Sequence, residues 1–262
     1  MSDTEKKNRP IGFMDSGVGG ISVLREAVRV LPNEDFIYYG DSLNAPYGTK
    51  TPDEIKELTF RAVEKLMEYD IKALVVACNT ATSSAIRDLR IKYSDMPVIG
   101  IEPAVKPAVV CSRGGRIIVM ATPMTIRQRK FRDLVRTYET EAEIVPLACE
   151  GLMEFVEEGI SDEKELMEYL DRNLGPVLTE NTESIVLGCT HYPFIAKYIK
   201  KYLGDRPIVL IDGSKGTSSH LKQRLADSRL LREEDTAGKV TMLNSSPDKR
   251  MIDLSWRLFN EV

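Results

Sequence analysis

Short apolar runs alternate with amphipathic stretches along all 262 residues, and this alternation constrains the fold more than any other feature of the sequence. The runs that read as strands are 11–15, 36–40, 73–77, 98–101, 116–121, 143–148, 184–188, 208–212 and 239–243. Helical stretches fill the intervals, at 20–31, 51–69, 81–93, 103–111, 123–137, 151–158, 162–179, 193–203 and 214–226, with a last helix ending near 260. The alternation of continuous apolar strands with helices predicts parallel sheets covered on both faces, an α/β fold.

One expected helix has a complete start signal. Thr51 can cap the amino end, Pro52 suits the first helical position, and Glu54 completes a capping box. The following apolar residues recur every three or four positions along one face. The helix expected from residue 51 is therefore well defined at its beginning.

Composition excludes several classes of protein. Hydrophobic residues make up 42% of the chain and charged residues 29%, which is typical of a globular domain and not of a disordered or coiled-coil chain. The net charge of −4 lacks the basic footprint of a nucleic-acid binder. The longest wholly apolar stretch, 73–78, is too short to span a bilayer, and the polar start has no secretory signal. We expect a cytoplasmic protein without nucleic-acid or membrane partners.

Two of the four cysteines stand at expected strand ends, where parallel sheets bind ligands. Cys78 is followed by Asn79 and Thr80, and Cys189 is followed by Thr190 and His191. A helix amino terminus lowers the pKa of a thiol there. Two reactive thiols suit removal of a proton from one face of a carbon and its return on the other. One alternative is a buried structural cysteine, and another is a Cys₂His metal set, which lacks any local ligand-pair spacing. A third is a cysteine nucleophile with a histidine base, which would leave the second cysteine without a task.

The other cysteines and the second histidine carry weaker signals. Cys111 ends an apolar helical stretch and is expected in the core. Cys149 follows a strand and could line a pocket. His220 lies in a polar helix without a motif and is expected at the surface.

A glycine-rich turn, 15–20, joins the first strand to the first helix. Gly17 and Gly19 match a dinucleotide-binding fingerprint, but Ser22 breaks it and Asp15 would repel a pyrophosphate. A turn without a ligand is one alternative. We favour a site for a small anion whose cationic group lies near Asp15.

These motifs together resemble the cofactor-independent glutamate racemases of the aspartate/glutamate racemase group. The resemblance rests on Asp15-Ser16-Gly17-Val18-Gly19-Gly20, Gly40-Asp41, Pro46-Tyr47-Gly48, Ala77-Cys78-Asn79-Thr80-Ala81, Ala121-Thr122-Pro123 and Gly188-Cys189-Thr190-His191-Tyr192-Pro193. It implies two pseudo-symmetric α/β domains with mainly parallel central sheets and the active site between them. The first domain would comprise 1–100 plus 211–262, and the second 101–210.

The resemblance also implies roles for individual residues. Cys78 and Cys189 would be the acid/base pair, assisted by Asp15 and His191. A family proline after Cys149 is missing here. A further catalytic glutamate downstream of this cysteine matches Glu157 best, and Glu154 and Glu158 stay open because they lie so close to it. The substrate-binding residues would be Asp15, Ser16, Tyr47, Gly48, Asn79, Thr80, Thr122, Thr190 and His191.

The implied activity is racemisation of glutamate, without metal or other cofactor, by a homodimer that supplies D-glutamate for peptidoglycan. The alternatives are a racemase of aspartate or another amino acid, and a non-catalytic module that binds a small anion or a nucleotide.

Overall fold

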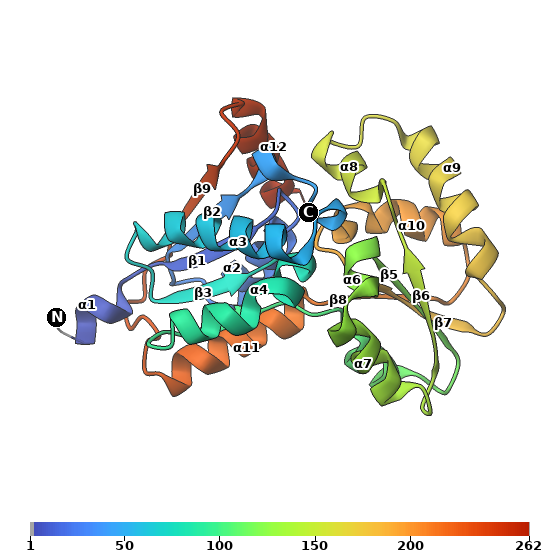
Figure 1. Ribbon diagram of the computed structural model, residues 1–262, viewed down its shortest axis with the longest axis horizontal. Coiled ribbons are helices and arrows are strands. Elements are labelled where there is room, and N and C mark those ends of the chain that lie inside the picture. Colours follow the sequence, from blue (N-terminus) through green and yellow to red (C-terminus); the bar gives the residue numbers. More distant parts are fainter. Residues whose placement is uncertain (1–2, 262) are drawn as a thin grey trace. The chain divides into compact units, whose positions relative to one another are not determined.

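The computed structural model describes residues 3–261, and its internal contacts divide the chain into two compact units. The first unit comprises Met1–Ile101 and Ser214–Val262, and the second comprises Glu102–Gly213. Figure 1 shows the helices and strands of both units in sequence colours. The second unit is thus continuous in sequence, whereas the first is assembled from two separated segments.

A parallel sheet with the strand order β4-β3-β1-β2-β9 forms the centre of the first unit. Its strands are β1 (Ile11–Asp15), β2 (Phe36–Gly40), β3 (Ala73–Val76), β4 (Val98–Gly100) and β9 (Val240–Asn244). The helices are α1 (Asp3–Lys7), α2 (Ile21–Val30), α3 (Pro52–Met67), α4 (Asn79–Lys92), α11 (Ser214–Asp227) and α12 (Lys249–Asn260). Two short 3-10 helices, η1 (Ser42–Asn44) and η2 (Tyr47–Thr49), follow β2.

The second unit is built on a parallel sheet with the order β6-β5-β7-β8. Its strands are β5 (Arg116–Ala121), β6 (Glu143–Ala148), β7 (Thr182–Leu187) and β8 (Val209–Asp212). The helices are α5 (Val105–Cys111), α6 (Pro123–Arg127), α7 (Arg129–Tyr138), α8 (Leu152–Glu157), α9 (Glu163–Asn173) and α10 (Ala196–Leu203). The 3-10 helices η3 (Gly175–Val177) and η4 (Tyr192–Ile195) complete it.

Four strands of the first sheet have the same order as the four strands of the second. The order β2-β1-β3-β4 corresponds to β6-β5-β7-β8, and β9 extends only the first sheet. Two mainly parallel sheets confirm the expected α/β class. In each unit the next two strands of the chain lie on opposite sides of the first strand, so the strand order reverses there. Open α/β sheets bind their ligands at such a switch point.

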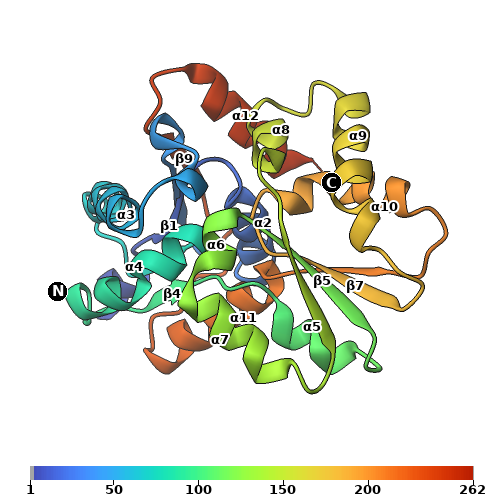
Figure 2. The ribbon, with the colours of Figure 1, turned by 45° about the vertical axis from the view of Figure 1, so that its right-hand side comes forward.

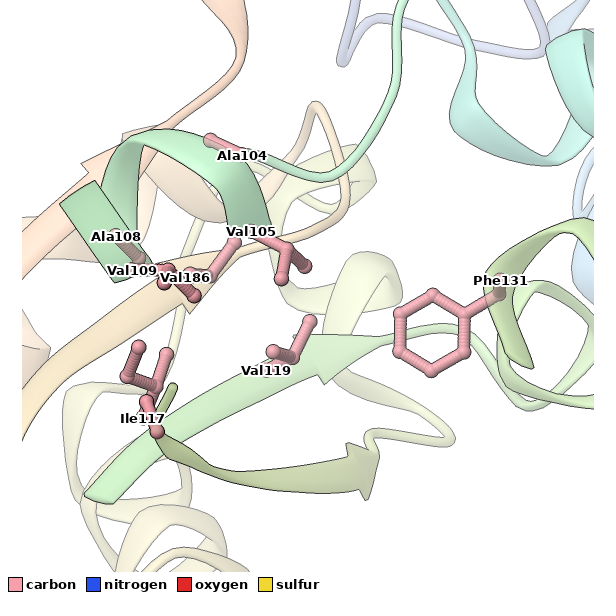
Figure 3. Packing of buried hydrophobic residues seen from close by; sticks show 9 residues of the cluster. Ala104, Val105, Ala108, Val109, Ile117, Val119, Phe131 and Val186 are labelled. Carbon is pink, nitrogen blue, oxygen red and sulfur yellow. The ribbon is translucent and has the colours of Figure 1, made fainter. Parts of the chain in front are cut away.

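Buried aliphatic side chains hold each sheet to its helices. In the second unit, Val105 of α5, Val119 of β5, Phe131 of α7 and Val186 of β7 belong to one cluster (Figure 3). In the first unit every residue of β1 is buried, because helices cover both faces of this central strand. Figure 2 shows the same helices from a second direction. Continuous apolar strands are therefore explained by burial on two sides.

The ends of several elements differ from the sequence expectations. The capping box of Thr51 and Glu54 is present as predicted. The expected helix 123–137 is two helices, because Gln128 has an extended backbone between them. The helix expected over 162–179 ends at Asn173, ahead of Pro176, whose ring cannot continue a helix. The helix α1 was not expected from the polar start of the chain.

Two observations concern surface and membrane. Cys111 is exposed at the end of α5, so its expected place in the core is wrong: only one face of this short helix meets the sheet. His220 is exposed as expected. Over residues 3–261, no helix combines the length and apolar character that crossing a membrane requires.

Candidate active site

The predicted site residues gather at the carboxyl ends of the central strands of each unit. In the first unit, Asp15 ends β1, and Cys78 comes two residues after the end of β3. In the second unit, Thr122 follows β5 and Cys189 comes just after β7. Each unit therefore holds one cysteine beside the corresponding strands of its sheet.

Cys78 caps the amino end of α4. Its Sγ accepts a hydrogen bond from the Ala81 N–H at 3.4 Å and lies 3.4 Å from the Ser16 Oγ. The helix begins at Asn79, two residues earlier than expected, because the thiol itself supplies the cap. Backbone donors and the positive end of the helix dipole favour the thiolate over the thiol at this position.

The carboxylate of Asp15 fills the glycine-rich turn. Asp15 is fully buried, and its Oδ1 accepts a hydrogen bond from the Gly17 N–H at 2.8 Å. A side chain at Gly20 would bring a Cβ within 2.7 Å of the Asp15 Cβ and 3.0 Å of the Ala77 Cβ. The glycine therefore allows α2 to start against the acid. At least one turn amide thus binds a carboxylate of the chain itself, which weakens the dinucleotide interpretation.

Tyr47 is held by an acid that the sequence reasoning did not select. The Tyr47 hydroxyl donates to the Asp41 Oδ2 at 2.7 Å, and the Asn44 side chain donates to both oxygens of the same carboxylate. Burial, and next the charge of Asp41, raise the pKa of Tyr47 far above its ordinary value. Asp41 directly follows β2, so the rule that selected Cys78 would also have found it.

Asn79 and Thr80 open α4, and both are buried. The Asn79 Oδ1 has no hydrogen-bond partner among the described residues. A buried amide oxygen without a donor is uncommon in folded proteins. This oxygen is therefore suited to accept a hydrogen bond from a cationic group of a ligand.

Three side chains of the second unit form a hydrogen-bonded series. The Cys189 Sγ lies 3.6 Å from the His191 Nδ1, and the His191 Nε2 lies 2.7 Å from the Glu157 Oε1. Burial lowers the pKa of His191, but hydrogen bonds to Cys189 and Glu157 outweigh it and hold the pKa well above the ordinary 6.5. The imidazole is then charged at neutral pH and donates from both nitrogens, which supports a thiolate at Cys189.

The geometry distinguishes the three candidate glutamates of α8 and its end. Glu157 is the one that contacts His191. Glu158 is exposed, and the Oε2 of Glu154 is buried without a hydrogen-bond partner among the described residues. Spacing alone could not select among the three.

A second thiol lies beside this series. Cys149 is buried; its N–H donates to the Ala121 carbonyl at 2.9 Å, and its carbonyl accepts from the Tyr192 hydroxyl at 3.2 Å. Burial, and next the negative charge of Cys189, raise the pKa of Cys149 to about 12. Cys149 therefore stays a neutral thiol at pH 7 and holds the adjoining loop through its backbone.

The remaining predicted residues are also near strand ends. Thr122 caps α6, its Oγ1 accepting from the Thr125 N–H at 3.2 Å, and Thr190 is buried next to Cys189. Gly48 is half-buried in η2, and Ser16 contacts Cys78. Thus the first unit holds Asp15, Ser16, Tyr47, Gly48, Cys78, Asn79 and Thr80, and the second holds Thr122, Glu157, Cys189, Thr190 and His191.

The two sets of residues can support similar chemistry, but they stabilise their cysteines in different ways. Each has a cysteine whose surroundings favour the thiolate, one through neutral donors and a helix end, the other through a charged imidazole. Within residues 3–261, no three or more His, Cys, Asp or Glu side chains gather as a metal ion would require. Both sets are suited to proton transfer at a carbon next to a carboxylate.

Known proteins match this chain over almost its whole length. The family model described as Asp/Glu/hydantoin racemase matches residues 11–217. A glutamate racemase of Clostridium novyi is 55% identical over 254 residues, covering 97% of this chain and 98% of the relative. The glutamate racemase of Francisella tularensis, solved with D-glutamate, has a TM-score of 0.83 at 27% identity and covers 97% of this chain and 95% of that one.

A third relative is the glutamate racemase of Escherichia coli, solved with L-glutamate and the activator UDP-MurNAc-Ala. It has a TM-score of 0.83 at 28% identity, with 95% of each chain covered. Near-complete coverage on both sides shows that the similarity extends over whole chains and is not confined to a shared motif. This chain therefore belongs to the Asp/Glu/hydantoin racemase family and is an amino-acid racemase, an isomerase.

Proposed function

We propose that this protein interconverts L-glutamate and D-glutamate by a two-base mechanism in which Cys78 and Cys189 act on opposite faces of the α-carbon. The observation that carries the proposal is the repeated placement of a cysteine. Each thiol follows the third strand of its sheet, and each has its own groups that favour a thiolate. The relatives solved with D-glutamate and with L-glutamate support glutamate as the substrate.

In the L-to-D direction the Cys189 thiolate takes the α-proton and becomes a thiol. The electron pair left on the α-carbon delocalises into the α-carboxylate. The Cys78 thiol then gives its proton to the other face of the carbon and becomes a thiolate. The D-to-L direction reverses both steps, so the two thiols exchange protonation states in each turnover.

Different groups stabilise the thiolate form of each cysteine during this cycle. On one side the charged His191, held by Glu157, stabilises the Cys189 thiolate. On the other side the Ala81 N–H and the helix dipole stabilise the Cys78 thiolate. Fixed donors of this kind lower a barrier without reorganising during the reaction.

The substrate groups are assigned by charge. The buried carboxylate of Asp15 and the unpartnered oxygen of Asn79 suit the α-ammonium. Thr80, Thr122 and Thr190 offer hydroxyl and backbone donors for the α-carboxylate.

The side-chain carboxylate is assigned to Ser16 and to the segment Tyr47-Gly48. Because the Tyr47 hydroxyl already donates to Asp41, the donors left there are the backbone N–H groups that open η2.

The experiment follows racemisation by circular dichroism for L-glutamate, D-glutamate, L-aspartate and L-glutamine, and repeats the glutamate reaction in D₂O. With two bases, early D-glutamate made from L-glutamate carries deuterium while the remaining L-glutamate stays protiated. Comparable deuterium in the remaining L-glutamate at low conversion would show a single base serving both faces. Faster turnover of aspartate than of glutamate would replace the proposed substrate by aspartate.

The proposed physiological role is supply of D-glutamate for peptidoglycan, as in the family that the motifs resemble. A strain depleted of this protein should then require D-glutamate for growth. Growth without D-glutamate, in a strain shown to lack any other source, would contradict this role.

A further inference from the structure

A cavity of about 590 Å³ lies in the first unit, away from the candidate active site. Its walls come from α1, from the segment 94–97 ahead of β4, and from the end of α11 with the residues that follow. These segments adjoin the amino ends of the strands, whereas Asp15 and Cys78 lie at the carboxyl ends. The cavity therefore belongs to the opposite edge of the sheet.

Basic side chains dominate the lining. Lys6, Lys7, Arg224 and Arg229 face one acidic lining residue, Asp95, so the lining carries a net charge of 4 − 1 = +3. Among the described residues, Lys7 pairs with Glu233, whereas none of the other three basic side chains is within ion-pair distance of a carboxylate. The whole chain has a net charge of −4, so this gathering does not follow from general basicity.

The short helix α1 is fixed at the rim of the cavity. The buried ammonium of Lys72 donates to the Lys7 carbonyl and to the Glu34 carboxylate. The Asn8 amide donates to the Glu234 carboxylate at 3.1 Å. These contacts fix the backbone at the end of α1, so Lys6 and Lys7 start from a fixed position at the rim.

Arg229 occupies a backbone conformation that favours glycine. Its φ is 55°, and it ends α11 in a turn closed by the hydrogen bond from the Leu230 N–H to the Leu225 carbonyl at 2.8 Å. Glycine is the usual residue there, because a Cβ is disfavoured in the left-handed region. An arginine at this position therefore costs conformational energy, and its side chain adds to the basic lining of the cavity.

A simpler explanation must be excluded. Basic side chains near helix carboxyl ends also offset the helix dipole, and α1 and α11 end at this cavity. That role needs neither a hollow of this volume nor several basic side chains without an ion-pair partner around it. The cavity volume lies within the range of small-molecule sites.

We propose that this cavity binds a small anion with at least two negatively charged groups, phosphates or carboxylates. Arg224 and Arg229 would provide planar paired donors for such groups, and Lys6 a mobile point charge. Leu230 and Met96 supply an apolar part of the wall. The anion occupies a site separate from the one that binds the racemase substrate.

The test is isothermal titration of the full chain with inorganic tripolyphosphate and, separately, with citrate at low salt. We expect saturable 1:1 binding of at least one probe, weakening as salt rises. The stronger probe identifies the ligand as a phosphate or a carboxylate compound. Arg224→Gln should weaken binding about tenfold or more, since it removes a charge-assisted hydrogen bond. Lys222→Gln, on the same helix but outside the lining, is the matched control and should change binding less than twofold.

Arg229→Gly separates binding from folding. It relieves the left-handed backbone, so the melting temperature should stay the same or rise while anion affinity falls about tenfold. The racemisation rate without anion should be unchanged in both arginine variants, so failure here would leave the proposed function standing. Absence of saturable binding for both probes, or an equal loss with Lys222→Gln, would overturn the proposal in favour of simple dipole compensation or diffuse attraction.

Discussion

Replacing Glu157 by glutamine should slow the proton transfer at Cys189 specifically. The change keeps the size of the side chain and a hydrogen-bonding oxygen, but it removes the negative charge 2.7 Å from the His191 Nε2. His191 is 1% exposed and the Glu157 side chain 14%, so solvent screens this contact only weakly. A hydrogen bond between charged groups contributes about 1.5–3 kcal/mol, which corresponds to about a 10- to 150-fold loss of kcat/KM.

The assay must account for the equal free energies of the two enantiomers. Because their equilibrium constant is 1, kcat/KM falls equally in both directions, whichever base is impaired. Substrate deuterated at the α-carbon resolves the two bases. If transfer at Cys189 becomes limiting, the isotope effect on kcat/KM should rise for L-glutamate and fall for D-glutamate.

Glu158→Gln provides the control for Glu157→Gln. Glu158 adjoins Glu157 but is exposed and makes no contact with His191, so its replacement should change kcat/KM less than about twofold. Thermal unfolding of both variants checks that the fold is kept. An isotope effect that shifts equally for both enantiomers, or a loss as large in the control, would refute the assignment of Glu157 to Cys189.

Three further changes probe other parts of the structure. Ser16→Ala should reduce kcat/KM a few-fold and shift the isotope effects in the opposite sense to Glu157→Gln, because Ser16 contacts Cys78. Mass spectrometry of both enantiomers at fixed reaction times measures these isotope effects. Because the pKa of His191 is raised in the folded protein, its protonation stabilises the fold fully below the unfolded pKa of about 6.5, and this stabilisation disappears as pH rises through the folded pKa. In urea unfolding, His191→Asn should therefore be most destabilised near pH 6 and least near pH 9. Lys72→Met leaves the Glu34 carboxylate buried without its cation and should lower the free energy of unfolding by about 3–5 kcal/mol in urea, whereas an unchanged midpoint would mean that the pair contributes nothing.

Strand positions were predictable because fully buried strands show as uninterrupted apolar runs. Eight of the nine expected strands start and end within one residue of the observed bounds, and one of these, β9, is shifted by one position throughout. The exception is β7, which begins two residues early at Thr182, where polar residues hide the start. The break between α6 and α7 could not be predicted, because Gln128 is neither a glycine nor a proline. The helix α1 could not be predicted either, because it depends on tertiary contacts such as the hydrogen bond from Lys72. Local pattern does not report such contacts.

Predictability within the candidate site followed the same division. Cys78 and Cys189 could be found from strand ends, and Tyr47 and Thr122 from the family-like motifs. The contact of Glu157 with His191 joins residues 34 positions apart, so sequence left three glutamates open. Asp41 was visible at a strand end but had no assigned task until its hydrogen bond with Tyr47 was seen.

The two compact units have different sequence continuity, and this has a consequence for biosynthesis. All residues of the second unit, Glu102–Gly213, have been translated before α11, β9 and α12 of the first unit have been made. Domains generally fold as units when their residues have left the ribosome. The middle of the chain can therefore reach its native packing first, while α2 still lacks α11, which packs against it, and β2 still has an unpaired edge. During that interval the exposed edge of β2 is the part of the nascent chain most open to wrong strand pairing, and a chaperone that shields it would act on the first unit alone.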